Sequence, residues 1–248
     1  YDEPESVKGT YRSLTGRSIG TLWGLQAERL YTDEDFENGK LKAGIPTPNI
    51  GSVVRPGDIK YRDMNDDGVV DAKDEGYIGG TTTPRIVYGF GGNVEYKNFD
   101  FSFFFQGTGD TYRVIGGTTY FIPGSGQTLQ GNVYSNYNDR WTEENPCSRF
   151  PRLTFMNKTH YLEDTDLWLM NGSYLRLKTA EISYTLLQKD FLKKVGIESV
   201  RFYCNGYNLL TLFSDLNDID IDPEGVTDGG NNNYPNIRIY NFGVNISF

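Results

Sequence analysis

The sequence predicts an all-β protein of the antiparallel transmembrane β-barrel class. Three observations carry this prediction: a strictly alternating final segment, a phenylalanine-rich hairpin, and long polar stretches between alternating runs. Successive side chains on a strand point to opposite faces, so strict alternation makes one face apolar and the other polar. In an outer-membrane barrel the apolar face meets lipid and the polar face meets a watery lumen.

The final nine residues alternate without a break. Asn241, Gly243, Asn245 and Ser247 separate five apolar residues, and the chain finishes on an aromatic side chain. Such an ending is typical of the closing strand of a barrel, although these residues alone also allow a half-buried strand of a soluble antiparallel sheet. We expect the five apolar residues to form the signal by which the barrel is assembled. They are Tyr240, Phe242, Val244, Ile246 and Phe248.

A second alternating segment predicts a β-hairpin. The run from Ile86 to Tyr96 and the run that starts at Phe99 flank a polar Lys97-Asn98 turn. Each run has about the 9–11 residues that a tilted strand needs to cross a bilayer. Every second residue of the second run is phenylalanine, from Phe99 to Phe105, which would be an aggregation hazard in water but suits lipid.

Two more strands are predicted near residues 174–186 and 200–210. The alternation of the first slips by one residue, which predicts a β-bulge near Thr179. Residues 188–196 predict a helical turn closed by Gly196. The stretch 107–172 predicts long outer loops, residues 39–57 predict a loop, and Thr32 is predicted to cap a short acidic helix over 32–38.

Composition excludes several classes of function. The net charge of −9 argues against nucleic acid as a partner. One histidine, His160, cannot build a multi-histidine metal site, and Cys147 and Cys204 have no metal-type spacing. The sequence contains no run of about 18 apolar residues, so it predicts no transmembrane helix. No nucleophile and base are paired in any recognisable motif, so we expect no enzyme.

One acidic segment predicts a cation site, which would bind calcium in a structural role. Carboxylates and amides recur at alternate positions around Gly68, as in a calcium-binding loop. Flanking helices are missing, so this is a calcium-loop-like insertion at residues 58–76 and not a full EF-hand. An acidic surface turn held by hydrogen bonds alone is the alternative. The ligands would be Asp63, Asn65, Asp67, Val69, Asp71 and Asp74.

Several motifs together resemble the SusC/RagA family of TonB-dependent outer-membrane transporters of the Bacteroidetes. The resemblance spans nearly the whole chain and follows the order of that family's carboxy-terminal region. The motifs are Gly16–Gly20, Pro56–Asp71, Tyr88–Phe90, Phe99–Gly107, Arg140–Pro146, Gly172–Lys178, Tyr207–Leu210 and Asn241–Phe248.

The resemblance implies a location in the outer membrane of a Gram-negative bacterium. It also implies import of glycans or oligopeptides, with a SusD-like surface lipoprotein and TonB as partners. Residues 1–248 would be the carboxy-terminal part of the barrel, without the plug and early strands, since barrels of this kind close with about 22 strands. Two alternatives stay open at this point: a passive porin-like barrel, and a secreted β-rich carbohydrate-binding module with a calcium loop.

Overall fold

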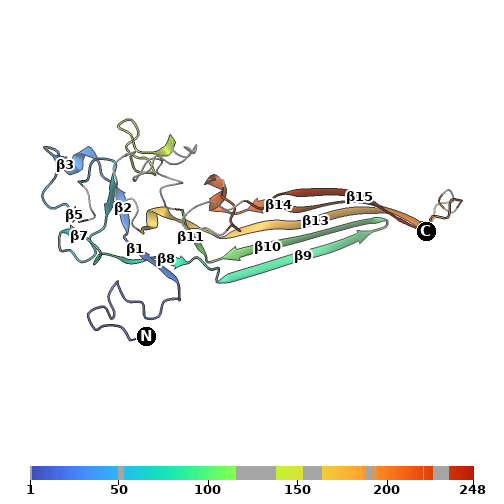
Figure 1. Cartoon of the computed structure of the whole chain (residues 1–248), viewed down its shortest axis with the longest axis horizontal. Helices are drawn as coiled ribbons and strands as arrows, with labels where there is room; N and C mark the ends of the chain where they lie inside the picture. The colour runs from blue at the N-terminus through green and yellow to red at the C-terminus, as the bar shows by residue number, and fades with distance from the viewer. Residues whose placement is uncertain are drawn as a thin grey trace. The chain divides into compact units, whose positions relative to one another are not determined.

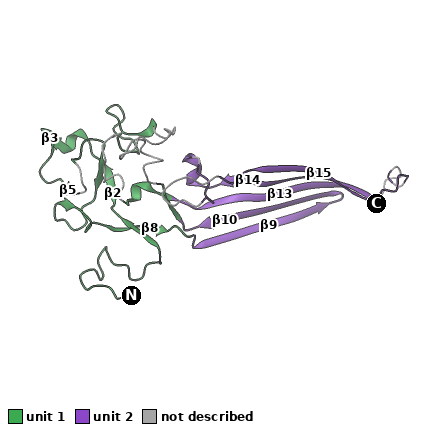
Figure 2. Ribbon diagram, in the orientation of Figure 1, with its two compact units in different colours: residues 1–83, 112–170, 226–233 green, residues 84–111, 171–225, 234–248 purple. Residues whose placement is uncertain are grey.

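The computed structural model of the chain describes residues 2–49, 53–115, 138–152, 164–187, 192, 194–219, 221–225 and 235–248. The regular elements with described bounds are strands and short 3₁₀ helices, which confirms the predicted all-β class (Figure 1). The chain forms two compact units (Figure 2). Unit 1 contains residues 1–83, 112–170 and 226–233, and unit 2 contains residues 84–111, 171–225 and 234–248.

Within the described ranges, no helix is both long enough and apolar enough to span a membrane.

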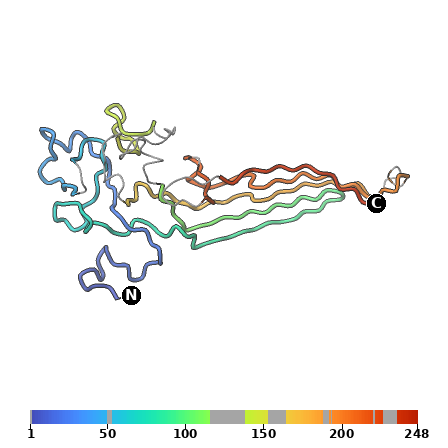
Figure 3. Tube along the Cα trace, viewed as in Figure 1, coloured from blue at the N-terminus to red at the C-terminus, as the bar shows by residue number. Residues whose placement is uncertain are grey.

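Unit 2 is one antiparallel sheet of five long strands, which Figure 3 shows side by side. The order of the strands across the sheet is β15-β14-β13-β10-β9. The strands are β9 (Ile86–Tyr96), β10 (Phe99–Gly109), β13 (Tyr174–Leu187), β14 (Ser199–Leu212) and β15 (Ile239–Ser247).

The register of the strands places short connections at one end of the sheet and long connections at the other. Tyr96 pairs with Phe99 across the two-residue turn of the predicted hairpin, and Lys97 in that turn has φ 58°. The link from β13 to β14 opens at the same end, because Leu187 pairs with Ser199. The links from β10 to β13 and from β14 to β15 leave the opposite end. This division matches the short turns and long loops predicted from the sequence.

The predicted β-bulge is present in β13. Phe104 pairs with Thr179 but Phe105 pairs with Leu177, so Lys178 is an extra residue in the ladder. The ladder with β14 also shifts between Leu177 and Thr179. A bulge of this kind allows the strand to keep its apolar side chains on one face while its phase in the sequence changes by one residue.

The connection after β13 is described only in part. The backbone amides of Val195 and Ile197 donate to the carbonyl of Leu192, at 3.1 and 3.0 Å, and Gly196 has φ +77°. These features agree with a turn closed by a glycine, while the other part of the predicted helical turn lies outside the described residues.

Unit 1 is built from short strand pairs around a small core. Its buried side chains include Leu25, Tyr31, Ile59, Tyr61 and Val70. The pairs are β1 (Thr21–Gly24) with β8 (Gly76–Thr81), β2 (Ala27–Leu30) with β6 (Ile59–Tyr61), β3 (Phe36–Glu37) with β4 (Lys40–Leu41), β5 (Thr47–Pro48) with β7 (Val69–Val70), and β11 (Tyr112–Val114) with β12 (Leu169–Asn171).

The acidic helix predicted over 32–38 is shorter than expected. Thr32 precedes a 3₁₀ helix, η1 (Asp33–Asp35), and the chain then enters the β3–β4 hairpin. Asn38 and Gly39 both have positive φ, 50° and 75°, as a two-residue hairpin turn requires. The Asn-Gly pair is a strong hairpin signal and explains why the helix stops. Two further 3₁₀ helices are η4 (Asp166–Trp168) and η5 (Asp215–Ile219).

Candidate functional site

One face of the five-stranded sheet is apolar from edge to edge. The register aligns the alternating residues of neighbouring strands into rows that cross the sheet. Two neighbouring rows are Tyr96–Phe99–Tyr184–Phe202–Val244 and Val94–Phe101–Ile182–Cys204–Phe242. The predicted phenylalanine stripe and the predicted terminal strand therefore lie on the same face.

The aromatic side chains of this face pack against one another. The ring centroids of Phe90 and Phe105 are 5.2 Å apart, and those of Phe99 and Tyr184 are 4.6 Å apart. Within the described chain the face is nevertheless exposed: Phe101 is 43% exposed and Phe242 is 80% exposed. A continuous apolar surface of this kind marks contact with a membrane or with another protein.

The opposite face carries a network of polar side chains. The guanidinium of Arg201 donates to Glu181 at 2.5 Å and to Ser183 at 3.2 Å, and Asn205 donates to Glu181 at 3.1 Å. Ser183 in turn donates to Asp100 at 3.3 Å. A hollow of about 340 Å³ lies beside these groups, lined by Asn93, Asp100, Ser102, Glu181, Thr185 and Arg201. These residues can contact water or a polar partner.

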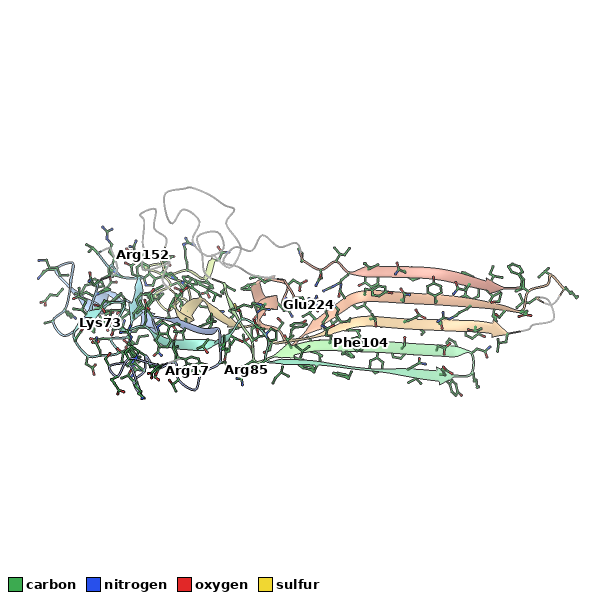
Figure 4. The ribbon with its side chains drawn as sticks, turned by 60° about the horizontal axis from the view of Figure 1, so that its bottom comes forward. Arg17, Lys73, Arg85, Phe104, Arg152 and Glu224 are labelled. Atoms are coloured by element: carbon green, nitrogen blue, oxygen red, sulfur yellow. The ribbon has the colours of Figure 1, made fainter. Side chains whose placement is uncertain are left out.

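Phe104 is an aromatic side chain on the polar face, and Figure 4 shows it on β10. A Cβ built at Gly89 would lie 3.0 Å from the Phe104 ring, and one built at Gly91 would lie 3.1 Å from it. The ring therefore lies over the glycine backbone of β9, where it covers the strand pair. Packing over glycine explains why this position breaks the polar pattern.

A buried ion-pair cluster anchors a loop to the start of β13. Arg176 is only 4% exposed and lies 2.8 Å from Asp222 and 3.1 Å from Glu224. Lys178, the bulge residue, lies 2.9 Å from Glu224, which Figure 4 labels. The hydroxyl of Tyr174 donates to Glu224 at 3.0 Å. This cluster was not predicted from the sequence. Its strand residues and its loop residues are about 46 residues apart, and the alternation of β13 predicts which face a strand residue lies on but not its partner in the loop.

The predicted cation loop folds as a turn that uses its own carboxylates. Gly68 donates its amide to Asp63, Asp67 to Asn65, Val69 to Asp67, and Lys73 to Asp71, at 2.7–2.9 Å. Asp74 is fully buried and accepts from the amides of Met64 and Asp71, both at 2.8 Å. The six predicted ligands therefore lie close together in one turn, and five of them use at least one side-chain oxygen to accept a backbone amide.

The ammonium of Lys73 also lies beside two of these carboxylates, 3.9 Å from Asp67 and 3.7 Å from Asp71. Over the part of the chain that the structure describes, no group of three or more His, Cys, Asp or Glu side chains is arranged to hold a metal ion. Calcium binding by Asp63, Asn65, Asp67, Val69, Asp71 and Asp74 thus stays a prediction.

The described geometry defines a membrane-facing antiparallel β-sheet, which is the class of a transmembrane β-barrel. Its strands of 9–14 residues are long enough to cross a bilayer when tilted. The apolar face is continuous, and the polar face carries hydrogen-bonded charges, as the lumen side of a barrel does.

Comparisons with known proteins agree with this class. Two proteins of Formosa agariphila (strain DSM 15362 / KCTC 12365 / LMG 23005 / KMM 3901 / M-2Alg 35-1) are each 30% identical to the chain. TonB-dependent receptor P26 matches over 97% of the chain and 24% of its own length, and TonB-dependent receptor P3 over 94% and 22%. The chain thus spans about a quarter of the length of these relatives. No protein-family model matches the chain.

Solved structures agree as well. The RagAB peptide transporter is 25% identical to the chain with a TM-score of 0.62, and the RagAB peptide importer in its closed-closed state is 25% identical with a TM-score of 0.63. Each match covers 92% of this chain and 23% of the solved chain. The chain therefore belongs to the SusC/RagA-type TonB-dependent receptors, as the resemblance predicts. These relatives are receptors and transporters, not enzymes.

The two faces of β10 predict destabilisation of different size for the same substitution at neighbouring positions. Phe103→Arg places a charge on the apolar face near the middle of β10 and should destabilise the folded receptor in bilayers by about 2–4 kcal/mol. Ser102→Arg places the same charge on the polar face, beside Asp100 and Glu181, and should cost far less. Urea titration of the full-length receptor in lipid vesicles measures both. Equal destabilisation by the two variants would contradict the assignment of the faces.

Proposed function

We propose that the chain is part of a TonB-dependent outer-membrane transporter that imports glycans or oligopeptides together with a SusD-like surface lipoprotein. The observation that carries the proposal is the apolar face that runs across all five strands of unit 2 without a break. Similarity to the RagAB peptide importer supports a transport role and a partner of this kind.

The sheet needs further strands for this function. In the described residues β9 and β15 each pair on one side only. In hydrocarbon, every backbone amide and carbonyl needs a hydrogen-bond partner, so both outer edges must be paired within a closed barrel. We propose that other strands of the same receptor pair with β9 and β15.

The apolar face also separates the proposal from a secreted carbohydrate-binding module. Every residue of β9 is exposed in the described chain, including Ile86, Phe90 and Val94. A module in water would have to cover these side chains, whereas a barrel turns them to lipid.

An uptake assay tests the function directly. Cells that express the full-length receptor should accumulate a fluorescent oligopeptide or oligosaccharide, and deletion of the receptor should abolish this. Deletion of TonB should abolish it equally, because the import is energised. Uptake that persists without TonB would indicate a passive porin-like barrel, and a receptor found outside the outer-membrane fraction would contradict the proposal.

We also propose that Tyr240, Phe242, Val244, Ile246 and Phe248 form the assembly signal of the barrel. All five are exposed on one face of the terminal segment. Removal of Phe248 should strongly reduce the fraction of receptor that reaches the outer membrane in folded form, measured by heat modifiability. Ser247→Ala is the matched control because it changes the polar face and keeps Phe248. Unchanged insertion after removal of Phe248 would contradict this role.

The acidic loop is proposed to bind Ca²⁺ weakly. One oxygen of Asp63, Oδ1, is buried without a hydrogen-bond partner in the described chain, so it is available as a ligand. Titration calorimetry of the full-length receptor should show calcium binding in the range of extracellular sites, a Kd of about 10⁻⁴–10⁻³ M. Asp63→Asn should abolish the heat, and Asp218→Asn, in η5 outside the loop, should leave it unchanged. A wild-type receptor that gives no calcium heat would contradict the proposal.

A further inference from the structure

A cleft of about 300 Å³ lies within unit 1 and belongs to none of the sites described above. Most of its wall is aliphatic, and the polar groups are gathered at a few positions. The apolar wall comes from strand β2, from β6, from η4 and from the loop that precedes Phe150. The main lining residues are Ala27, Leu30, Ile59, Pro146, Leu167 and Arg149.

The walls of the cleft are fixed by contacts around it. β2 pairs with β6, and the amide of Ala27 donates to the carboxylate of Asp166 at 2.8 Å, which ties β2 to η4. The loop wall is anchored where Phe150 stacks on the buried Trp168, with ring centroids 6.2 Å apart and planes 8° apart. Because both walls are held by buried groups, the cleft exists before any ligand binds.

A buried ion pair holds the same loop a few residues further on. Arg152, which Figure 4 labels, lies 2.6 Å from Asp58, and the side chain of Asp58 is fully buried. The amide of Arg152 also donates to the carbonyl of Gly57 at 2.9 Å. These bonds tie the loop to the segment that leads into β6.

Among the described residues that line the cleft, one cation is not paired with a carboxylate. Arg29 binds both carboxylate oxygens of Asp35 at 2.6 Å, and this pairing lowers the pKa of Asp35 to about 2, so the pair is already neutralised. Glu28 pairs with Lys60 at 3.2 Å. Arg149 is exposed, its guanidinium lies 5.4 Å from the centroid of the Phe150 ring, and none of the ion pairs among the described residues includes it.

We propose that this cleft binds the carboxy-terminal residue of an oligopeptide, with an apolar side chain in the cleft and the terminal carboxylate on Arg149. Its volume is at the low end for ligand sites, which suits one residue and not a large ligand. An arginine fork matches the two oxygens of a carboxylate. None of the described lining residues is aromatic, so the cleft lacks a surface on which a sugar ring could stack. The proposal rests on the import function above and narrows its substrate class to peptides.

Cys147 lines the cleft and is an exposed free thiol, so its alkylation can report on binding. The test uses the full-length receptor in detergent and follows modification of Cys147 by mass spectrometry in its tryptic peptide, which is 141–149 in the wild-type sequence and 141–152 in the Arg149→Gln variant. The probes are the tripeptide Gly-Gly-Leu, its carboxy-terminal amide, Gly-Gly-Ser, and maltotriose. Protection is expressed relative to the unprotected rate of each variant, because loss of an arginine can change thiol reactivity.

Gly-Gly-Leu should protect Cys147, whereas its amide should bind about tenfold more weakly because the charge-assisted bonds are lost. Arg149→Gln should weaken Gly-Gly-Leu by a similar factor and remove the difference between acid and amide. Arg62→Gln, which removes a surface cation outside the cleft, should leave protection unchanged. Gly-Gly-Ser and maltotriose should protect little.

Equal protection by acid and amide in the wild-type receptor would overturn the proposal, as would the absence of protection by Gly-Gly-Leu or protection by maltotriose alone. The assay needs neither TonB nor an energised membrane. Loss of uptake with intact protection would therefore count against the transport function only, and loss of protection with intact uptake would count against the cleft only.

Discussion

The structure of unit 2 depends on the hydrogen-bond ladders that join its five long strands. A bilayer core offers no water to satisfy backbone amides and carbonyls, so only structures that pair them internally can cross it. The ladders pair the backbone amides and carbonyls between neighbouring strands of the sheet, from β9 to β15. The side chains therefore determine what each face contacts. Alternation then yields an apolar face and a polar face from the same residues.

Two residues of unit 2, Lys178 and Phe104, depart from regular alternation, and each makes a local stabilising contact. The ammonium of the extra residue Lys178 forms an ion pair with Glu224, and Arg176 at the start of β13 pairs with the same carboxylate. Phe104 falls on the polar face but lies over the glycine backbone of β9. Each exception thus adds a contact between strands or between a strand and its loop, and neither interrupts the apolar face.

Much of unit 2 could be predicted from the sequence because its signals are local. The hairpin, the bulge near Thr179 and the terminal strand follow from a period of two over 9–14 residues. Unit 1 was harder to predict, since its strands are two to six residues long and, apart from the β3–β4 hairpin, pair with strands that are tens of residues away in the sequence. The acidic loop shows the limit most clearly: its spacing predicts a cation site, yet Asp74 is buried against two backbone amides, which spacing cannot reveal.

The central claim is that one face of unit 2 contacts lipid and the other contacts water or polar protein groups. Single-cysteine variants at each position from Phe99 to Gln106, carrying nitroxide spin labels in the full-length receptor in bilayers, measure this directly. Collision with lipid-soluble oxygen should peak at positions 99, 101, 103 and 105, and collision with a water-soluble nickel complex should peak at the positions between them. Accessibility without a period of two, or with the opposite phase, would contradict the account.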